Sequence, residues 1–483
     1  MNPGTAELTA EIETAPSGPK VGAFFDFDGT LISGYSARAF IEDQLRRRQV
    51  PPLDVLRGVG AALDMTFRGS DVTGLMKITA RSSKGQPESE LVALGQRLWS
   101  GRIAGMAYPE ARALVQAHQR RGHTVVLASS ATRYQVEPFA ADLGIDHVLC
   151  TRFGVAEGRM TGELDGPVLW GEGKAAAVRS FAAAHGVDLA ESFGYANGDE
   201  DIAFLETVGH PRPLNPGPRL AKAAEERGWP VRRFARRDGI DLVSVARTGA
   251  AVAGLAVAAG AAVAVGLVNR SRRDAANLAA SAGTDLTLAL AGVKLNVVGE
   301  EHLWSHRPAI FVFNHQSSLD VLIIGNLLRR DVTGVAKAEA ASDPRFAVFG
   351  ALAGVAYVDR TDTAQAVSAL DQVLVRLADG VSIAIAPEGT RSTTATLGPF
   401  KKGAFHMAMQ AGVPVVPIVI RNAGELMWRG SVLVRPGTID IAVLPPVDTT
   451  RWRREDIDDH VEDVRRQFLE TLDDWPATHW NAG

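Results

Sequence analysis

Cysteine is almost absent from this chain, since its 483 residues include a single one, Cys150. An internal disulfide needs two cysteines, so disulfide-stapled secreted scaffolds are excluded, and the composition fits a reducing compartment. An excess of charge of one sign is also missing, because 51 basic and 55 acidic residues give a formal net charge of -4. This balance provides no electrostatic argument for binding nucleic acid.

The first residues lack the apolar run of a secretory signal peptide. Residues 1–20 are polar and acidic and contain proline and glycine, so we expect a disordered tail there. A chain of 483 residues is long enough for two or three domains, each with its own buried core. We therefore analyse the motifs as parts of separate domains.

A histidine and an aspartate, His315 and Asp320, follow an apolar run at residues 309–313. On one regular helix, five residues turn the chain by about 140°, so the two side chains would face apart. The pattern instead predicts a buried strand, a loop and then a helix from Leu319, with Ser317 or Ser318 as the N-cap. Across such a loop the two side chains can meet.

A carboxylate on one imidazole nitrogen fixes the tautomer, so the other nitrogen can take a proton from a hydroxyl. Asp320 and His315 are therefore predicted to form a general base without a nucleophile of its own. The alternative is a loop histidine at the surface beside an aspartate that only caps a helix.

An apolar segment that begins at Val21 ends in two aspartates, Asp26 and Asp28, followed by Gly29. The two-residue period of an extended chain puts both carboxylates on one side, and the glycine permits a sharp turn. Such a pair can bind a divalent cation, or one carboxylate can act as a nucleophile and the other as an acid. An exposed acidic turn is the alternative.

Three further motifs follow this pair along the chain. They are a predicted strand that ends in Ser129, a glycine-lysine pair at Lys174 that opens a helical run, and the acidic segment 197–201. Together with Asp26 and Asp28, they resemble the four ordered motifs of the haloacid dehalogenase (HAD) superfamily of phosphatases, in its phosphoserine-phosphatase-like branch.

The resemblance implies a role for each of these side chains. Asp26 would attack the phosphorus to give an aspartyl-phosphate, and Asp28 would shuttle the proton. Ser129 and Lys174 would hold the phosphoryl oxygens. The implied cofactor is Mg²⁺, with ligands at Asp26, Asp28, Asn197 and Asp201.

Asn197 departs from the pattern of that branch, which usually has an aspartate as a magnesium ligand there. A neutral carbonyl in place of a carboxylate should weaken Mg²⁺ binding, although Asp199 and Asp201 lie nearby in the sequence. A HAD domain that only regulates or tethers is therefore the alternative to a working phosphatase.

Residues 248–269 carry no charge and are rich in alanine, valine and glycine, between arginine-bearing segments. About 20 apolar residues suffice to cross a bilayer, but alanine and glycine contribute little transfer energy. We favour a helix lying in one leaflet at the cytoplasmic face of the plasma membrane, with the arginines attracted to anionic lipid. A membrane span and a buried helix of a soluble domain remain alternatives.

Polar groups follow three predicted strands after Asp320. One is the Val-Asp-Arg sequence that ends at Arg360, and another is the turn at residues 387–391, with Lys401 soon after it. The third strand, at residues 413–418, contains prolines, which predict a position at the sheet edge. Active sites of α/β folds lie at such loop ends. Two guanidiniums with turn amides suit a phosphate monoester, although a surface ion pair is the alternative for a single arginine.

With His315 and Asp320 in front, these motifs resemble the glycerolipid acyltransferase family, specifically 1-acylglycerol-3-phosphate acyltransferases. The resemblance implies that His315 deprotonates the free hydroxyl of lysophosphatidic acid, which attacks the thioester of acyl-CoA or acyl-carrier protein. A base without a serine or cysteine nucleophile implies direct transfer. The implied phosphate pocket contains Arg360, Glu388, Gly389, Thr390, Arg391 and Lys401. For Glu388, a structural pairing with a nearby cation is the alternative.

We therefore expect an α/β chain with two enzymatic domains joined by a membrane-associating helix. The expected segments are a tail at 1–20, a Rossmann-like HAD domain at 21–220 with a helical cap at about 36–102, a basic linker with the apolar helix at 221–284, an acyltransferase α/β domain at 285–450, and a closing helix and tail at 451–483. The alternatives are a HAD domain that dephosphorylates the lipid product, and a scaffolding protein of the membrane surface.

Overall fold

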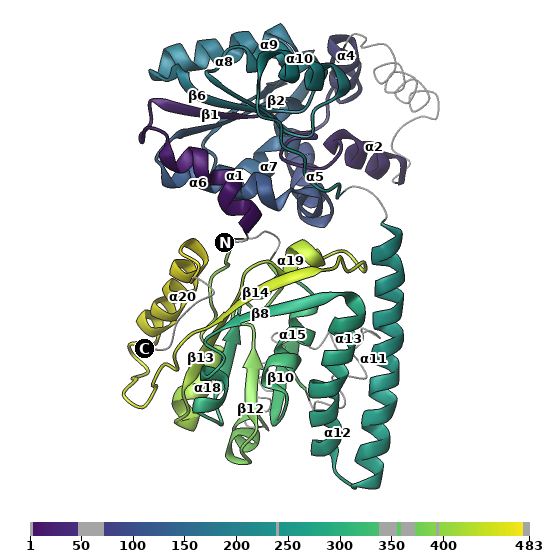
Figure 1. The fold of residues 1–483 in the computed structure, drawn as a ribbon, viewed down its shortest axis with the longest axis vertical. Coiled ribbons are helices and arrows are strands. Elements are labelled where there is room, and N and C mark those ends of the chain that lie inside the picture. The colour runs from purple at the N-terminus through teal and green to yellow at the C-terminus, as the bar shows by residue number, and fades with distance from the viewer. Residues whose placement is uncertain are drawn as a thin grey trace. The chain divides into compact units, whose positions relative to one another are not determined.

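The computed structural model describes residues 3–46, 72–237, 241–337, 355–358, 372–392 and 396–476. The chain divides into two compact units, Met1–Gly239 and Ile240–Gly483. Each unit has its own sheet, built mostly from parallel strands and covered by helices (Figure 1). The fold is α/β throughout, as predicted.

The sheet of the first unit has five parallel strands in the order β3-β2-β1-β6-β7. Their bounds are β1 Val21–Phe25, β2 Thr124–Thr132, β3 His147–Thr151, β6 Asp188–Ala196 and β7 His210–Pro213. Every residue of β1 is buried, as expected for a strand with helices on both faces. Since β1 is central, the chain after Phe25 emerges in the middle of the carboxyl edge of the sheet.

Helices cover both faces of this sheet. Figure 1 shows α8, α9 and α10 on one face and α1, α6 and α7 on the other. Their bounds are α1 Pro3–Thr14, α6 Pro109–Arg120, α7 Arg133–Leu143, α8 Glu172–His185, α9 Ile202–Leu205 and α10 Pro218–Arg227. Phe24 of β1 meets Phe181 of α8 edge to face at 6.2 Å, which joins the sheet to this layer.

The expected disordered tail at residues 1–20 is wrong, because helix α1 forms there. Ile12 is 1% exposed, and Glu11 forms an ion pair with Arg212 of β7. Contacts with distant residues hold the helix, and its periodicity within the sequence is too weak to reveal it.

The described part of the expected cap is helical. It contains α2 Ser36–Arg46, η1 Ile103–Met106, α4 Val72–Ser82 and α5 Glu88–Gly101, while residues 47–71 lie outside the described ranges. An antiparallel hairpin, β4 Phe153–Ala156 and β5 Arg159–Leu164, was not foreseen. Phe153 and Met160 of this hairpin pack with Ala80 of α4 in one apolar cluster.

The second unit has a seven-stranded sheet in the order β11-β10-β12-β9-β13-β14-β8. The strands are β8 Val293–Val298, β9 Ile310–Phe313, β10 Val332–Lys337, β11 Ala356–Val358, β12 Ser382–Ile385, β13 Val415–Ile420 and β14 Gly437–Val443. Ile310 and Val312 enter one apolar cluster, whereas Phe311 and Phe313 enter another. This alternation shows that both faces of central strand β9 are buried.

Strand β13 is internal, so the predicted edge position for residues 413–418 is wrong. It pairs in parallel with β9 and antiparallel with β14. The carbonyl of Pro417 accepts from the amide of Leu444, which lies beyond the end of β14. The N–H and C=O of one strand residue face the same neighbour, so the missing N–H of Pro417 removes only the second bond of this last pair, at the end of the β13–β14 ladder.

Helices surround this sheet as well. They are α12 Arg272–Leu278, η3 Ala279–Gly283, α13 Thr284–Ala291, α14 His302–Ser305, α15 Leu319–Leu328, α18 Gly403–Ala411, α19 Ala423–Leu426 and α20 Ile457–Asp473. Val464 and Phe468 of α20 are buried, so the expected closing helix packs against the unit.

The long apolar helix α11 spans Leu242–Val268 and begins earlier than the predicted residues 248–269. The Asp241 carboxylate caps it by accepting from the amides of Val243 and Ser244. The helix runs beside α12 and α13 (Figure 1). Only 17% of its most apolar 18-residue stretch is buried, and by length and composition the helix could cross a membrane. This burial is low for the core helix of a soluble domain.

Candidate functional site

Three of the predicted HAD residues meet in the interior of the first unit. Lys174, near the start of α8, donates to Oδ1 of Asp26 at 2.8 Å. The same Lys174 Nζ lies 2.6 Å from Oδ1 of Asp201, in the short helix η2 Asp199–Asp201. The three side chains are buried, so one ammonium bridges two carboxylates that lie far apart in the sequence.

This burial shifts the pKa values of the bridging pair. Burial disfavours the charge of Lys174, but the carboxylates of Asp201 and Asp26 outweigh it and raise the pKa of the lysine. Burial also raises the pKa of Asp201, against the opposing influence of Lys174. The lysine therefore remains a cation beside Asp26, as needed to hold a phosphoryl oxygen.

Asp28 has a different environment, although it lies two residues from Asp26. Its Oδ1 accepts from the amide of Ser36 at 2.6 Å, and its Oδ2 from the Ser36 hydroxyl at 3.2 Å. Burial raises the pKa of Asp28 to about 7, helped by the charge of Asp26 and opposed by these hydrogen bonds. A carboxyl group with this pKa can give or take a proton near neutral pH.

Asn197 lies directly against the motif that contains Asp26. Thr30 Oγ1 is 3.0 Å from Asn197 Oδ1 and 3.3 Å from Asp26 Oδ2. Gly29 has a φ of +77°, and a Cβ there would lie 2.1 Å from Asn197 Nδ2. The glycine therefore both makes the turn and leaves room for the amide.

The donor set fits Mg²⁺, which prefers oxygen ligands. Asp26 and Asp201 offer carboxylate oxygens and Asn197 an amide oxygen, and Oδ2 of Asp201 is buried without a hydrogen-bond partner. Across the described residues, no cluster of three or more His, Cys, Asp or Glu side chains could hold a metal, so a site here would need a ligand of another kind, such as the amide oxygen of Asn197. The side chain of Asp28 is engaged by Ser36 instead.

Ser129 lies at the same edge of the sheet. Phe25 of β1 pairs with Leu127 of β2, which places Ser129 level with the residues just after β1. The Ser129 side chain is buried and its Oγ accepts from the amide of Ala131 at 3.2 Å.

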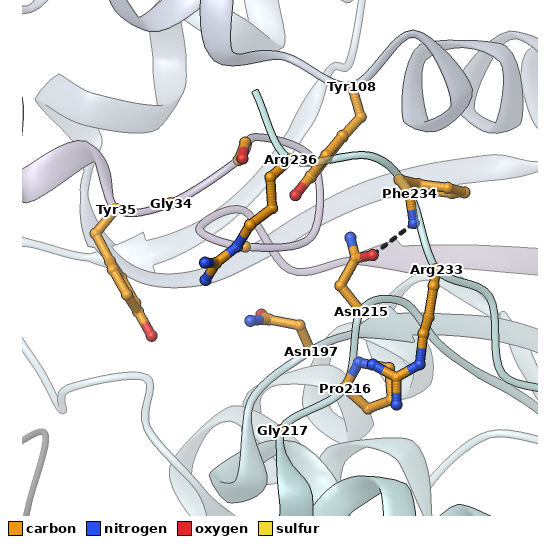
Figure 2. Close-up of a pocket in the computed structure, with 12 residues that line it drawn as sticks. Gly34, Tyr35, Tyr108, Asn197, Asn215, Pro216, Gly217, Arg233, Phe234 and Arg236 are labelled. Atoms are coloured by element: carbon orange, nitrogen blue, oxygen red, sulfur yellow. Dashed lines mark hydrogen bonds between the residues drawn. The ribbon is translucent and has the colours of Figure 1, made fainter. Parts of the chain in front are cut away.

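A cavity of about 450 Å³ opens beside Asn197 (Figure 2). It is lined by Gly29, Ser33, Gly34, Tyr35, Tyr108, Asn197, Asn215, Pro216, Gly217, Arg233, Phe234 and Arg236. The last three fall within the linker predicted at residues 221–284, because nothing in that stretch of sequence indicates that it folds back onto the first unit.

In the second unit, His315 lies in the loop between β9 and α15, as predicted. Its Nδ1 is 2.7 Å from Oδ2 of Asp320, which is fully buried in the first turn of α15. The same Oδ2 accepts from the amides of Gln316 and Ser317 at 2.7 and 2.8 Å. The aspartate thus orients the imidazole and the loop together, and leaves Nε2 of His315 for chemistry.

The turn after β12 holds the backbone of His315 on both sides. Glu388 Oε1 accepts from the amide of His315 at 2.8 Å, and Oε2 accepts from the amide of Gly398 at 2.9 Å. The amide of Ser392 donates to the carbonyl of His315 at 2.6 Å. Burial raises the pKa of Glu388, and the two amide hydrogen bonds oppose this. Glu388 therefore accepts from two backbone amides, a positioning role that was not predicted from the sequence.

Arg391 is in the same turn and reaches the helix that carries Asp320. Its Nη1 donates to the Ser318 hydroxyl at 2.7 Å and to the carbonyl of Arg429 at 3.1 Å. Arg429 in turn donates to the carbonyl of Arg391 at 3.0 Å. The structure thus places one predicted phosphate-binding arginine beside the His315 loop, together with a second arginine that no sequence motif indicated.

The other predicted pocket residues are placed less completely. Gly389 has a φ of +76° in this turn, Thr390 is exposed, and the amide of Lys401 donates to the carbonyl of Pro387 at 2.9 Å. Arg360 lies outside the described residues. The loop of Lys401 therefore returns to the turn of Arg391, whereas the position of Arg360 stays a prediction.

Two family models match the chain. That of the haloacid dehalogenase-like hydrolases matches residues 23–206, and that of the acyltransferases matches residues 294–421. A probable phosphatase of Mycobacterium tuberculosis is 33% identical over 272 residues, which are 53% of this chain and 94% of that protein.

The second unit has relatives as well. The 1-acyl-sn-glycerol-3-phosphate acyltransferase of Saccharomyces cerevisiae is 35% identical over 184 residues, which are 38% of this chain and 60% of that protein. The chain thus spans less than two thirds of that relative. A crystal structure of the 1-acyl-sn-glycerophosphate acyltransferase from Thermotoga maritima is 24% identical, and the match covers 49% of this chain and 97% of that one with a TM-score of 0.42, a weak likeness.

Proposed function

Since the chain belongs to the haloacid dehalogenase-like hydrolase family through its first unit and carries an acyltransferase domain in its second, we propose that it is a two-site enzyme of lipid metabolism. The second unit acylates lysophosphatidic acid to phosphatidic acid, with acyl-CoA or acyl-carrier protein as donor. The first unit hydrolyses a phosphomonoester with Mg²⁺. The observation that carries this proposal is the 2.7 Å contact between His315 Nδ1 and the buried carboxylate of Asp320.

Acyl transfer requires one proton to move at His315. Its Nε2 takes the proton of the acceptor hydroxyl while that oxygen forms a bond to the thioester carbonyl carbon. The carbon–sulfur bond then breaks, and the imidazolium returns the proton to the departing thiolate. Asp320 keeps Nδ1 as the donor throughout and stabilises the imidazolium. Arg391 and Arg429 supply the positive charge for the phosphate of the acceptor.

Phosphate release requires a nucleophile and an acid in the first unit. A carboxylate oxygen of Asp26 attacks the phosphorus, and the bond to the leaving alcohol breaks as Asp28 protonates it. Water then attacks the aspartyl-phosphate and gives its proton to Asp28, whose pKa of about 7 suits both steps. Lys174 and Ser129 hold the phosphoryl oxygens. Mg²⁺, held by Asp26, Asn197 and Asp201, would neutralise part of the phosphate charge.

The replacement Asn197→Asp should lower the Mg²⁺ concentration that gives half-maximal phosphate release, by about tenfold, because a carboxylate binds the cation more strongly than an amide. Aspartate has nearly the same shape, so the space left by Gly29 accommodates it. The measurement is phosphate release against Mg²⁺ after treatment with EDTA. Acyl transfer by the same preparation serves as the control, since the residues proposed for it belong to the second unit and Asn197 belongs to the first. An unchanged Mg²⁺ requirement would remove Asn197 from the ligand set.

We propose that α11 anchors the enzyme in the cytoplasmic leaflet of the plasma membrane, where a phospholipid acceptor and a soluble thioester can meet. The supporting observation is the row of exposed valines on α11, such as Val252 at 64% and Val257 at 68% exposed. An apolar surface of this kind is unfavourable in water and stabilised within lipid.

A double replacement, Val252→Asp with Val257→Asp, is expected to move the protein from the membrane pellet to the supernatant after an alkaline carbonate wash. A charge buried in lipid costs about 2.5–3.5 kcal/mol, so two charges should reduce partitioning by at least about a hundredfold. The matched control is Val92→Asp with Val155→Asp, two exposed valines of the first unit. Complete release of the unmodified protein by carbonate would exclude an embedded helix.

The experiment that tests the acyltransferase proposal is formation of phosphatidic acid by the purified full chain from lysophosphatidic acid and acyl-CoA or acyl-carrier protein. No phosphatidic acid with either donor would contradict the proposal.

A further inference from the structure

The cavity in the first unit adjoins the group that attacks phosphorus. Asn197 lines the cavity, and the Thr30 hydroxyl lies within hydrogen-bond distance of both the Asn197 amide oxygen and the Asp26 carboxylate. A molecule whose phosphate reaches Asp26 therefore has room for the rest of its body in this cavity. Its volume of about 450 Å³ is within the range of pockets for small molecules.

Two arginines give this cavity a positive charge. Arg233 and Arg236 both line it and both are exposed. Figure 2 shows the guanidinium of Arg236 directed into the cavity between Tyr35 and Asn197. Among the described residues, neither guanidinium forms an ion pair with a carboxylate. Two guanidiniums at one cavity with no acidic partner there are suited to bind an anion from solution.

The segment that carries these arginines is fixed to the first unit. The amide of Phe234 donates to Asn215 Oδ1 at 2.6 Å, and the amide of Arg237 donates to Ser33 Oγ at 2.9 Å. Arg232 pairs with Leu214 in a β-bridge. Because the backbone is held before, between and after the two arginines, their side chains start from defined positions at the cavity wall.

Asn215 adds a neutral donor at the same wall. Its backbone has a φ of +49°, and its Oδ1 is used by Phe234. The remaining Nδ2 is buried and has no hydrogen-bond partner. Figure 2 shows this nitrogen on the side of Asn215 that faces the cavity. An unpaired buried donor is unfavourable, and an anion in the cavity would satisfy it.

Tyr35 connects this positive wall with the catalytic carboxylates. Partial desolvation raises its pKa, the charges of Glu200, Asp28 and Asp26 raise it further, and Arg236 counteracts them. Tyr35, Arg236 and Asn197 line the same cavity, and Figure 2 shows the arginine between the other two, on the side of the proposed site of phosphate cleavage.

We propose that Arg233, Arg236 and Asn215 form a second anion subsite, so that the first unit acts on a small phosphomonoester that carries a second acidic group, a phosphate or a carboxylate. The reacting phosphate is already served by Lys174 and Ser129, and the two arginines therefore remain for another charge. This inference rests on the proposed phosphatase function of the same site and specifies its substrate class.

The test compares three probes that share a three-carbon chain: propyl phosphate, propane-1,3-diyl bisphosphate and 3-phosphonooxypropanoate. With the full chain and Mg²⁺, kcat/KM should be about tenfold or more higher for a probe with two acidic groups than for propyl phosphate, mainly through KM. The two doubly acidic probes show whether a phosphate or a carboxylate is the preferred second group.

In Arg236→Gln this preference should fall by about tenfold, whereas Arg232→Gln should retain it, because Arg232 belongs to the same segment but does not line the cavity. Equal kcat/KM for all three probes in the unmodified chain, or equal effects of the two variants, would overturn the subsite.

A binding measurement separates the subsite from the phosphatase function on which it rests. Calorimetric titration of the full-length Asp26→Asn protein, with Mg²⁺ present, should show tighter binding of the bisphosphate than of propyl phosphate, and Arg236→Gln should remove this difference. If no probe is hydrolysed but the Arg236-dependent difference persists, the phosphatase function is wrong and the subsite stands. If hydrolysis depends on Asp26 but the probes bind equally, the subsite is wrong and the phosphatase function stands.

Discussion

Replacing His315 by alanine is expected to reduce formation of phosphatidic acid by at least about a hundredfold, which is the usual contribution of a general base. Without the imidazole, no other titratable group in this loop can take the hydroxyl proton, because the Asp320 carboxylate is fully buried. The measurement is acyl transfer from acyl-CoA to lysophosphatidic acid by the purified full chain.

Two controls accompany this variant. His306→Ala removes an exposed histidine from the same unit and should leave acyl transfer unchanged. Phosphate release by the His315→Ala protein should also persist, because the residues assigned to it belong to the first unit. Normal acyl transfer by His315→Ala would show that the base is elsewhere.

Replacing Asp26 by asparagine should reduce phosphate release to the background of the assay, because an amide oxygen is a poor nucleophile and cannot form the aspartyl-phosphate. Asparagine has nearly the same shape, and Lys174 keeps its ion pair with Asp201 at 2.6 Å, so the site should remain folded. The measurement is phosphate release from the doubly acidic probes described above.

Asp146→Asn is the matched control, since Asp146 is an exposed aspartate of the same unit. It should leave phosphate release unchanged, and Asp26→Asn should leave acyl transfer unchanged. Phosphate release that survives in Asp26→Asn would mean either a different nucleophile or a contaminating phosphatase. A preparation of Lys174→Ala would separate the two explanations. Phosphate release by a contaminant would be the same in both variants, whereas release by this protein with another nucleophile would fall in Lys174→Ala.

The centre of each site could be predicted because it depends on short-range rules. His315 and Asp320 meet because a strand ends and a helix begins between them, and this change of period is visible in the sequence. Asp26 and Asp28 follow a short apolar strand for the same reason. Local propensity and apolar pattern decide such features, so no knowledge of distant contacts is needed.

The features that were missed depend on contacts between distant residues. Helix α1 is held by Ile12 and by the pairing of Glu11 with Arg212. Arg233 and Arg236 line the cavity because Ser33 and Asn215 hold their segment. A single sequence shows that such residues are basic or apolar but not which partner they find, so these positions could not be predicted.

The prediction that residues 413–418 form an edge strand was wrong for a related reason. The rule that proline disfavours internal strands concerns a lost hydrogen bond, and for Pro417 that bond would have pointed beyond the end of β14. The length of the neighbouring strand decides whether the rule applies, and that length is set by tertiary structure.

The two proposed sets of catalytic residues lie in separate stretches of the chain, divided near Gly239. Asp26, Lys174 and Asp201 lie before this point, and the pair His315 and Asp320 lies after it. An inherited change that disables one reaction therefore leaves the machinery of the other in place. Natural selection can refine either activity, or let it decay, while the gene continues to supply the second one.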